Sequence, residues 1–218
     1  FMLGSMIALT LLIFVGVTPG MDVATTLLLI LAVLLVTMAI TAILNVSIER
    51  VAYKPLRHAP RLAPLITAVG VSFVVQNVSL AIYGVDFESV PSFIPRTDAI
   101  TIGEIAIQWN KLAVFFIVVP VLLALVWFVR STRQGKAMRA VSQDTEASAM
   151  MGIDVNRTIS VTFFLAGSLA AVAGLVYLLQ FNMRYDTGFE LGLIAFTAAV
   201  LGGIGNLTGA VLGAMVIG

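Results

Sequence analysis

The sequence predicts an all-α, polytopic helical membrane protein, and three observations lead to that prediction. Apolar residues make up 60% of the 218 residues, charged residues make up only 11%, and the mean hydropathy is +1.09. A soluble domain averages about 45–50% apolar and about 25% charged residues, so this chain lacks the polar side chains that a surface facing water requires. The apolar residues also form runs that approach the ~20 residues a helix needs to cross a bilayer.

Composition and motifs exclude several classes of function. The net charge is +1, so no overall field attracts a nucleic acid. The chain has no Cys and a single His, which excludes disulfides, thiolate metal sites and multi-histidine metal sites. The sequence has no G-x-x-x-x-G-K-S/T phosphate loop. No ionisable side chain lies well inside an apolar run, where a membrane enzyme or a proton-coupled carrier needs one. We therefore expect no catalytic residue, no metal and no resident cofactor.

Six membrane segments are expected along the chain. They cover residues 1–18, 23–48, 62–83, 112–129, 158–180 and 191–218. Pro120 predicts a kink in the fourth segment, and a cluster of glycines interrupts the last one. Both chain ends lie inside apolar runs without the polar or aromatic anchors that flank a membrane helix. We therefore expect residues 1–218 to form one transmembrane domain that is incomplete at both ends.

The basic residues predict how the chain is oriented in the membrane. Loop 49–62 holds four Lys and Arg residues and loop 130–157 holds five, whereas the loops on the opposite side hold three together. The positive-inside rule therefore places loops 49–62 and 130–157 in the cytoplasm. Loops 84–111 and 181–190 are then external.

Two polar residues, Gln76 and Asn77, fall near the middle of the third segment. A buried amide is costly in lipid unless it is paired, so these side chains should face another helix or a water-filled path. The pattern is compatible with packing against another helix and with lining a pathway, and we name the two residues as pathway candidates.

A glycine-rich run interrupts the last segment. The pathway candidates in this part of the chain are Thr197, Gly202, Gly203, Gly205 and Asn206. Glycine costs about 1 kcal/mol relative to alanine inside a helix, and Asn206 is suited to cap a helix that follows it. The run predicts a broken or re-entrant segment, which is tolerated at membrane depth only against protein or water. A tight crossing of two helices is the alternative.

Small residues recur at four-residue spacing in the last two segments. They are Ala166, Ala170 and Gly174 in one segment and Gly205, Gly209 and Gly213 in the other. Each set is expected to share one helix face, which lets a neighbouring helix approach closely.

The loop 130–157 contains a short predicted helix over residues 143–153. The residues that define it are Asp144, Glu146, Ala147, Met150, Met151, Gly152 and Ile153. The two acids lie near its start, where negative charge favours the helix dipole, and the glycine is placed to end it. The alanine and the methionines would expose an apolar patch. Such patches usually meet a partner, and methionine adapts readily to a groove.

Several sequence motifs occur together in this chain. They are I-E-R-V-A-Y-K-P-L-R at 48–57, A-P-R-L at 59–62, L-I-T-A-V-G at 65–70, G-K-A-M-R-A at 135–140, M-G-I-D at 151–154 and A-F-T-A-A-V-L-G-G-I-G at 195–205. In combination they resemble the LIV-type, LivH-like permease subunits of branched-chain amino acid ABC importers, and the resemblance covers nearly the whole chain. Residues 146–152 also fit the importer pattern E-A-A-x-x-x-G, with Ser148 in place of the second alanine and without the later I-x-L-P.

The resemblance implies an assembly of several proteins in a bacterial inner membrane. A paralogous permease subunit would pair with this chain and form the pathway with it. Two cytoplasmic ABC ATPase subunits would bind the ATP, and loop 130–157 would couple to an ATPase through residues 143–153. A periplasmic or extracellular binding protein would deliver leucine, isoleucine or valine at the external loops. There Asp86, Glu88 and Asp186 either pair with it or are solvated.

Two other functions fit the same residues. A passive channel or facilitator for small neutral solutes such as urea or amides would also lack charge inside the membrane. Related importers for urea, short amides or other amino acids would share the architecture. The position of residues 143–153 distinguishes an ATP-driven importer from a passive channel, because an importer requires these residues on the same side as the arginine-rich loops and outside the bilayer.

Overall fold

The computed structural model describes residues 1–16, 23–57, 59–60, 63–84, 98–102, 105–184 and 186–218. Its α-helices are α1 (Met2–Val15), α2 (Val23–Ile48), α3 (Ala63–Tyr83), α4 (Trp109–Ser131), α5 (Arg133–Gln143), α6 (Thr145–Met150), α7 (Val155–Leu178), α8 (Thr187–Gly202) and α9 (Leu207–Ile217). A π-helical turn, η1 (Glu49–Tyr53), and a 3-10 turn, η2 (Lys54–Leu56), follow α2.

Two short strands lie in the loop that the sequence placed outside the cell. β1 (Asp98–Ile102) and β2 (Ile105–Gln108) pair as an antiparallel hairpin before α4. The expectation of an all-α chain did not include this hairpin. The β-branched residues of both strands favour extended backbone, and this local preference accounts for the difference.

Among the described residues, four helical stretches are long and apolar enough to cross a membrane. They are Leu28–Leu56, Ala63–Tyr83, Val114–Ser131 and Val155–Leu178. The helices α1, α8 and α9 are apolar but shorter. The prediction of a polytopic helical membrane protein is therefore confirmed, and Pro120 lies inside α4 as expected. The glycine break expected in the sixth segment is confirmed, because α8 ends at Gly202 and α9 begins at Leu207.

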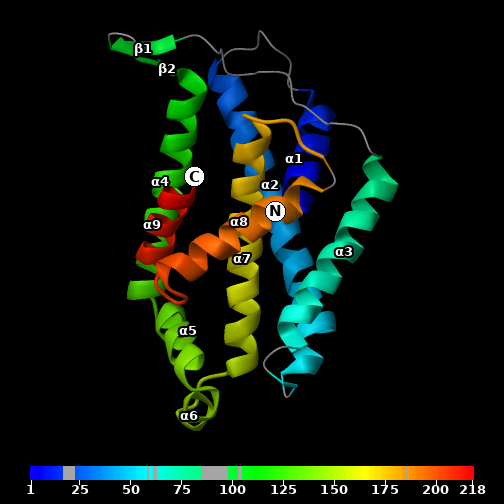
Figure 1. The fold of residues 1–218 in the computed structure, drawn as a ribbon, viewed down its shortest axis with the longest axis vertical. Helices are drawn as coiled ribbons and strands as arrows, with labels where there is room; N and C mark the ends of the chain where they lie inside the picture. Colours follow the sequence, from blue (N-terminus) through cyan, green and yellow to red (C-terminus); the bar gives the residue numbers. More distant parts are fainter. Residues whose placement is uncertain (17–22, 58, 61–62, 85–97, 103–104, 185) are drawn as a thin grey trace.

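The core lies where α1, α2 and α7 meet (Figure 1). α7 packs along α2 and also contacts α1, and the side chains of Met6, Leu12 and Leu175 are almost completely buried there. Many large apolar side chains on the outside of the helices are exposed. In a membrane such side chains face lipid, so close backbone packing rather than water exclusion holds the helices together.

Small residues bring α7 close to its neighbours. A Cβ added at Gly167 would lie 2.8 Å from the backbone oxygen of Thr41 on α2, and one added at Gly174 would lie 2.8 Å from a backbone oxygen at the start of α1. Ala171, between the two glycines, is fully buried. The prediction that Ala166 and Gly174 share the contact face of this helix is therefore partly wrong. Gly174 lies on the face of α7 that packs against α1 and α2, but Ala166 is exposed, because that face follows positions 167, 171 and 174.

The helices α8 and α9 form a hairpin closed by glycine. Gly203 and Gly205 in the turn have φ angles of +91° and +96°, a region that glycine adopts without strain. The side-chain oxygen of Asn206 caps α9 by accepting from the backbone N–H of Gly209 at 3.2 Å. A Cβ added at Gly202 would lie 2.1 Å from the backbone oxygen of Gly209. The break and the tight crossing, alternatives on the sequence, therefore occur together.

The turn position of Gly205 corrects one expectation. Gly205 shares no helix face with Gly209 and Gly213, because it lies before α9 begins. Gly213 does approach α8, since a Cβ added there would lie 2.4 Å from the backbone oxygen of Ala198. Figure 1 shows α8, in orange, inclined to the long axes of α2 and α7.

The described parts of the two basic loops lie at the same end of the molecule, at the bottom of Figure 1. η1 and η2 lie there together with α5 and α6, whereas β1, β2 and residues 179–184 lie at the opposite end. This arrangement agrees with the orientation expected from the positive-inside rule, in which loops 49–62 and 130–157 share one side. Asp86 and Glu88 lie outside the described residues.

Candidate functional site

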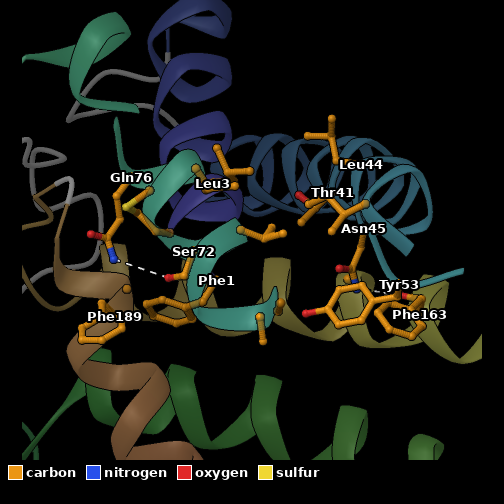
Figure 2. Close-up of a pocket in the computed structure, with 18 residues that line it drawn as sticks. Phe1, Leu3, Thr41, Leu44, Asn45, Tyr53, Ser72, Gln76, Phe163 and Phe189 are labelled. Carbon is orange, nitrogen blue, oxygen red and sulfur yellow. Dashed lines mark hydrogen bonds between the residues drawn. The ribbon is translucent and has the colours of Figure 1, made fainter. Parts of the chain in front are cut away.

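A cavity of about 250 Å³ lies between α1, α2, α3, α7 and the start of α8. Figure 2 shows its lining, in which the ring of Phe163 lies beside that of Tyr53, with centroids 5.3 Å apart, and the ring of Phe189 lies near Phe1. Among the described residues that line it, none is Asp, Glu, Lys, Arg or His. A mostly apolar pocket with a small number of polar groups is typical of a site for a small molecule.

The polar side chains of the cavity come from α2, η1 and α3. They are Thr41, Asn45, Tyr53, Ser72 and Gln76. The amide nitrogen of Gln76 lies 3.4 Å from the hydroxyl oxygen of Ser72, one turn away on α3. This distance is long for a hydrogen bond, so the amide keeps most of its capacity for another partner. The amide of Asn45 donates to the backbone oxygen of Phe163 at 2.7 Å and ties α2 to α7.

Thr41 contributes a buried hydroxyl to the lining. The residue is 6% exposed, and its Oγ1 has no hydrogen-bond partner within the described part of the chain. Thr37, one turn earlier, instead donates to the backbone oxygen of Val33 at 2.7 Å. An unpaired buried hydroxyl costs on the order of 1–3 kcal/mol. A polar group of a solute in the cavity would recover part of that cost.

The cavity includes one of the expected pathway residues and excludes the others. Gln76 lines it, whereas Asn77 is exposed and its amide donates to the backbone oxygen of Phe73 at 2.8 Å. Thr197 is also exposed, and its hydroxyl donates to the backbone oxygen of Ile194 at 2.8 Å. The remaining candidates form the α8–α9 junction and do not line the cavity: Gly202, Gly203, Gly205 and Asn206.

Sequence reasoning missed the α2 side of this cavity. Thr37, Thr41 and Asn45 follow one another at intervals of four residues, so they share one face of the helix. That spacing was a signal available in the sequence. The polar face meets α7 at Gly167, where a Cβ would lie 2.8 Å from both the Cβ of Asn45 and the backbone oxygen of Thr41.

The predicted short helix is present as α6, at the basic end of the molecule. Asp144 Oδ1 caps it by accepting from the backbone N–H groups of Glu146 at 2.9 Å and Ala147 at 3.0 Å. Gly152 follows with a φ of +82°, the left-handed conformation that often ends a helix. The acids at the start of this helix and the glycine after its end are therefore confirmed, but the helix is shorter than the predicted 143–153, because Gln143 ends α5 and α6 covers Thr145–Met150.

Two methionines project from the end of α6. Met150 and Met151 are 83% and 84% exposed, whereas Ala147 and Ile153 are half-buried. The expected apolar patch therefore consists mainly of the two methionines. An exposed, adaptable apolar pair outside the membrane-spanning helices is suited to a groove on another protein.

The helix α6 is connected through α5 to α4 and α7. The Thr132 hydroxyl caps α5 by accepting from the backbone N–H of Gly135 at 3.0 Å. A Cβ added at Gly135 would lie 2.4 Å from the backbone oxygens of Phe128 and Val129, so the sharp turn from α4 into α5 requires glycine. α5 also contacts α7. A force applied to α6 would therefore reach both α4 and α7.

Comparison with known proteins decides the family. Residues 1–218 match the family described as branched-chain amino acid transport system, permease component. The chain belongs to this family. The resemblance inferred from the motifs is thereby confirmed, and no solved structure matches this permease.

Curated relatives of this permease are similar along most of its length. BraD, a permease protein of the high-affinity branched-chain amino acid transport system of Pseudomonas aeruginosa, is 34% identical over 226 aligned residues, covering 100% of this chain and 71% of BraD. LivH from Salmonella typhimurium is 34% identical over 223 residues, with the same coverage of 100% and 71%. LivH from Escherichia coli K12 is 38% identical over 177 residues, covering 79% of this chain and 57% of LivH. These relatives are named as transport permeases and not as enzymes.

Proposed function

We propose that this permease is the membrane-spanning subunit of an ATP-driven importer for branched-chain or related amino acids in a bacterial inner membrane. The observation that carries the proposal is the match of all 218 residues to the branched-chain amino acid permease family. The names of BraD and LivH support the substrate class. None of these relatives supports the alternative of a passive channel.

The free energy of ATP binding and hydrolysis is transmitted to this permease through α6. The permease has no phosphate-binding loop of its own, so two cytoplasmic ABC ATPase subunits supply ATP binding and hydrolysis. Met150 and Met151 enter a groove on an ATPase subunit. Because α6 is already capped at Asp144 and ended at Gly152, it loses little conformational freedom on docking. Closure of the ATPases displaces α6 and, through α5, the helices α4 and α7.

The solute passes between this permease and a paralogous permease subunit. The cavity beside α3 is this chain's contribution, in which apolar walls contact a branched aliphatic side chain and Thr41, Ser72 and Gln76 offer hydrogen bonds. Passage requires binding that is weak enough to release the solute, and a lining without charged side chains meets that requirement for an amino acid of zero net charge. An external binding protein delivers the amino acid at loops 84–111 and 181–190.

The test is made on the importer assembled with its partner subunits. Met150→Asp combined with Met151→Asp should abolish co-purification of the ATPase subunits and ATP-dependent leucine uptake in proteoliposomes, because the groove would bury two unpaired charges. Ser142→Asp, at an exposed position of α5, is the matched control and should leave both measurements unchanged. Undiminished ATPase association in the methionine variant, or leucine flux through this chain alone, would overturn the proposal.

A further inference from the structure

A second pocket lies at the basic end of the molecule, between the end of α2 with η1 and η2 on one side and the start of α7 on the other. Its volume is about 540 Å³. Four basic side chains line it: Arg50, Lys54, Arg57 and Arg157. This pocket is separate from the cavity beside α3, and the residues lining the two do not overlap.

The charge of the pocket is only partly balanced by the protein. Arg57 pairs with Glu49, whose carboxylate is fully buried and also accepts from the Ser160 hydroxyl at 2.9 Å. The Glu49 carboxylate therefore neutralises Arg57 and none of the other three cations of the pocket. The side chains of the three other cations have no ion pair within the described residues and are exposed at the mouth of the pocket: Arg50, Lys54 and Arg157.

The pocket has an apolar wall that extends toward the middle of the membrane. Val46 on α2 and Val161 and Phe164 on α7 form this wall, within stretches long and apolar enough to cross a membrane. Phe164 is 43% exposed. It lies seven residues beyond Arg157 on the same helix, which corresponds to a rise of about 10 Å. The pocket is thus basic at the membrane surface and apolar one to two turns deeper.

We propose that this pocket binds the phosphate headgroup of an anionic phospholipid of the cytoplasmic leaflet, with an acyl chain against Phe164. Basic pockets between membrane helices on the cytoplasmic side suit lipid phosphates. A free phosphate would need only the cations, whereas the apolar wall at membrane depth fits the chain attached to a lipid phosphate. The bound lipid contacts both η1 and α7, so it also stabilises the position of the start of α7, next to α6.

The experiment compares lipid binding by native mass spectrometry of the purified permease complex titrated with phosphatidylglycerol or phosphatidylcholine. The R50Q/K54Q double variant removes two pocket cations while keeping similar side-chain length. The R133Q/K136Q double variant is the matched control, since it removes two exposed cations of α5 at the same end but outside the pocket. The wild-type complex and the control should prefer phosphatidylglycerol by about tenfold, and R50Q/K54Q should lose that preference.

Three results would overturn the proposal. An equal loss in R133Q/K136Q would mean that diffuse surface charge and not the pocket attracts the lipid. Displacement of phosphatidylglycerol by millimolar inorganic phosphate would mean a free-anion site. Loss of ATPase co-purification in R50Q/K54Q with unchanged lipid preference would mean a protein interface. If R50Q/K54Q does not assemble, Phe164→Ala provides the measurement, because it should weaken binding of long-chain phosphatidylglycerol while leaving the folded complex intact.

Discussion

The guanidinium of Arg57 donates to the side-chain oxygen of Asn156, and this contact joins the segment after α2 to the first turn of α7. The two residues are 99 positions apart in the sequence. Arg57 also pairs with the buried Glu49 of its own loop, so one arginine contacts a carboxylate within loop 49–62 and an amide in loop 130–157. The contact lies close to α6 in the sequence, because α7 begins at Val155 and α6 ends at Met150.

Loss of Arg57 should destabilise the permease strongly. Arg57→Met leaves the Glu49 carboxylate buried without a counter-ion, which typically costs about 3–5 kcal/mol. The midpoint of thermal unfolding in detergent should fall accordingly. Arg57→Met combined with Glu49→Leu removes both charges and should recover most of the stability. A single variant as stable as the wild type would show that the pair contributes little.

The α8–α9 crossing should tolerate no side chain at Gly202. Gly202→Ala places a Cβ 2.1 Å from the backbone oxygen of Gly209, so the helices must separate and both thermal stability and transport should decrease. Gly192→Ala is the matched control on the same helix, where an added Cβ meets nothing within 4 Å. The control should be neutral or more stable by up to about 1 kcal/mol, because alanine favours helix. Equal behaviour of the two variants in a thermal melt would contradict the tight crossing.

The cap of α6 should affect coupling more than folding. Asp144→Ala removes the acceptor for two backbone N–H groups and should weaken α6 by about 1 kcal/mol, lowering the affinity for the ATPase subunits about fivefold. Asp144→Asn keeps a good capping side chain and should retain wild-type affinity. Titration of purified ATPase against the permease in nanodiscs measures both. If the asparagine variant binds as weakly as the alanine variant, the charge and not the cap is what matters.

The cavity hydroxyl should matter for transport and not for stability. Thr41 and Ser79 both carry buried hydroxyls without a partner among the described residues, but only Thr41 lines the cavity. Thr41→Val and Ser79→Ala should each leave the melting temperature unchanged or slightly higher, because no hydrogen bond is lost. Thr41→Val should raise the KM for amino-acid uptake about fivefold, and Ser79→Ala should not. The same KM in both variants would remove Thr41 from the pathway.

The orientation can be tested by cysteine labelling, since the native chain has no Cys. Lys136→Cys lies at an exposed position of α5, and Asn182→Cys lies at an exposed position within residues 179–184, the segment at the opposite end of the molecule in Figure 1. A membrane-impermeant maleimide should label Asn182→Cys in intact cells and Lys136→Cys only after permeabilisation. The reverse pattern would invert the topology and place α6 outside the cell.

Local chemistry determined the features that the sequence alone predicted. A helix satisfies its own backbone hydrogen bonds in lipid, so an apolar run of bilayer length marks a span, and α2 has the bounds that the run predicts. The cap at Asp144 and the left-handed Gly152 involve neighbours within a few residues. The glycines at 202–205 likewise break a helix through their own backbone preferences.

Tertiary structure decided which faces of the helices meet. Apolar residues surround α3 on all sides, so the sequence pattern does not distinguish the side of Gln76 from that of Asn77. Gln76 lines the cavity only because α3 lies beside α1, α2 and α7. The contact of Arg57 with Asn156 equally requires α2 and α7 to lie together. The physical reason is that lipid and protein interior are similarly apolar. A hydrophobic pattern therefore shows that a helix lies in the membrane without showing which neighbour each of its sides will touch.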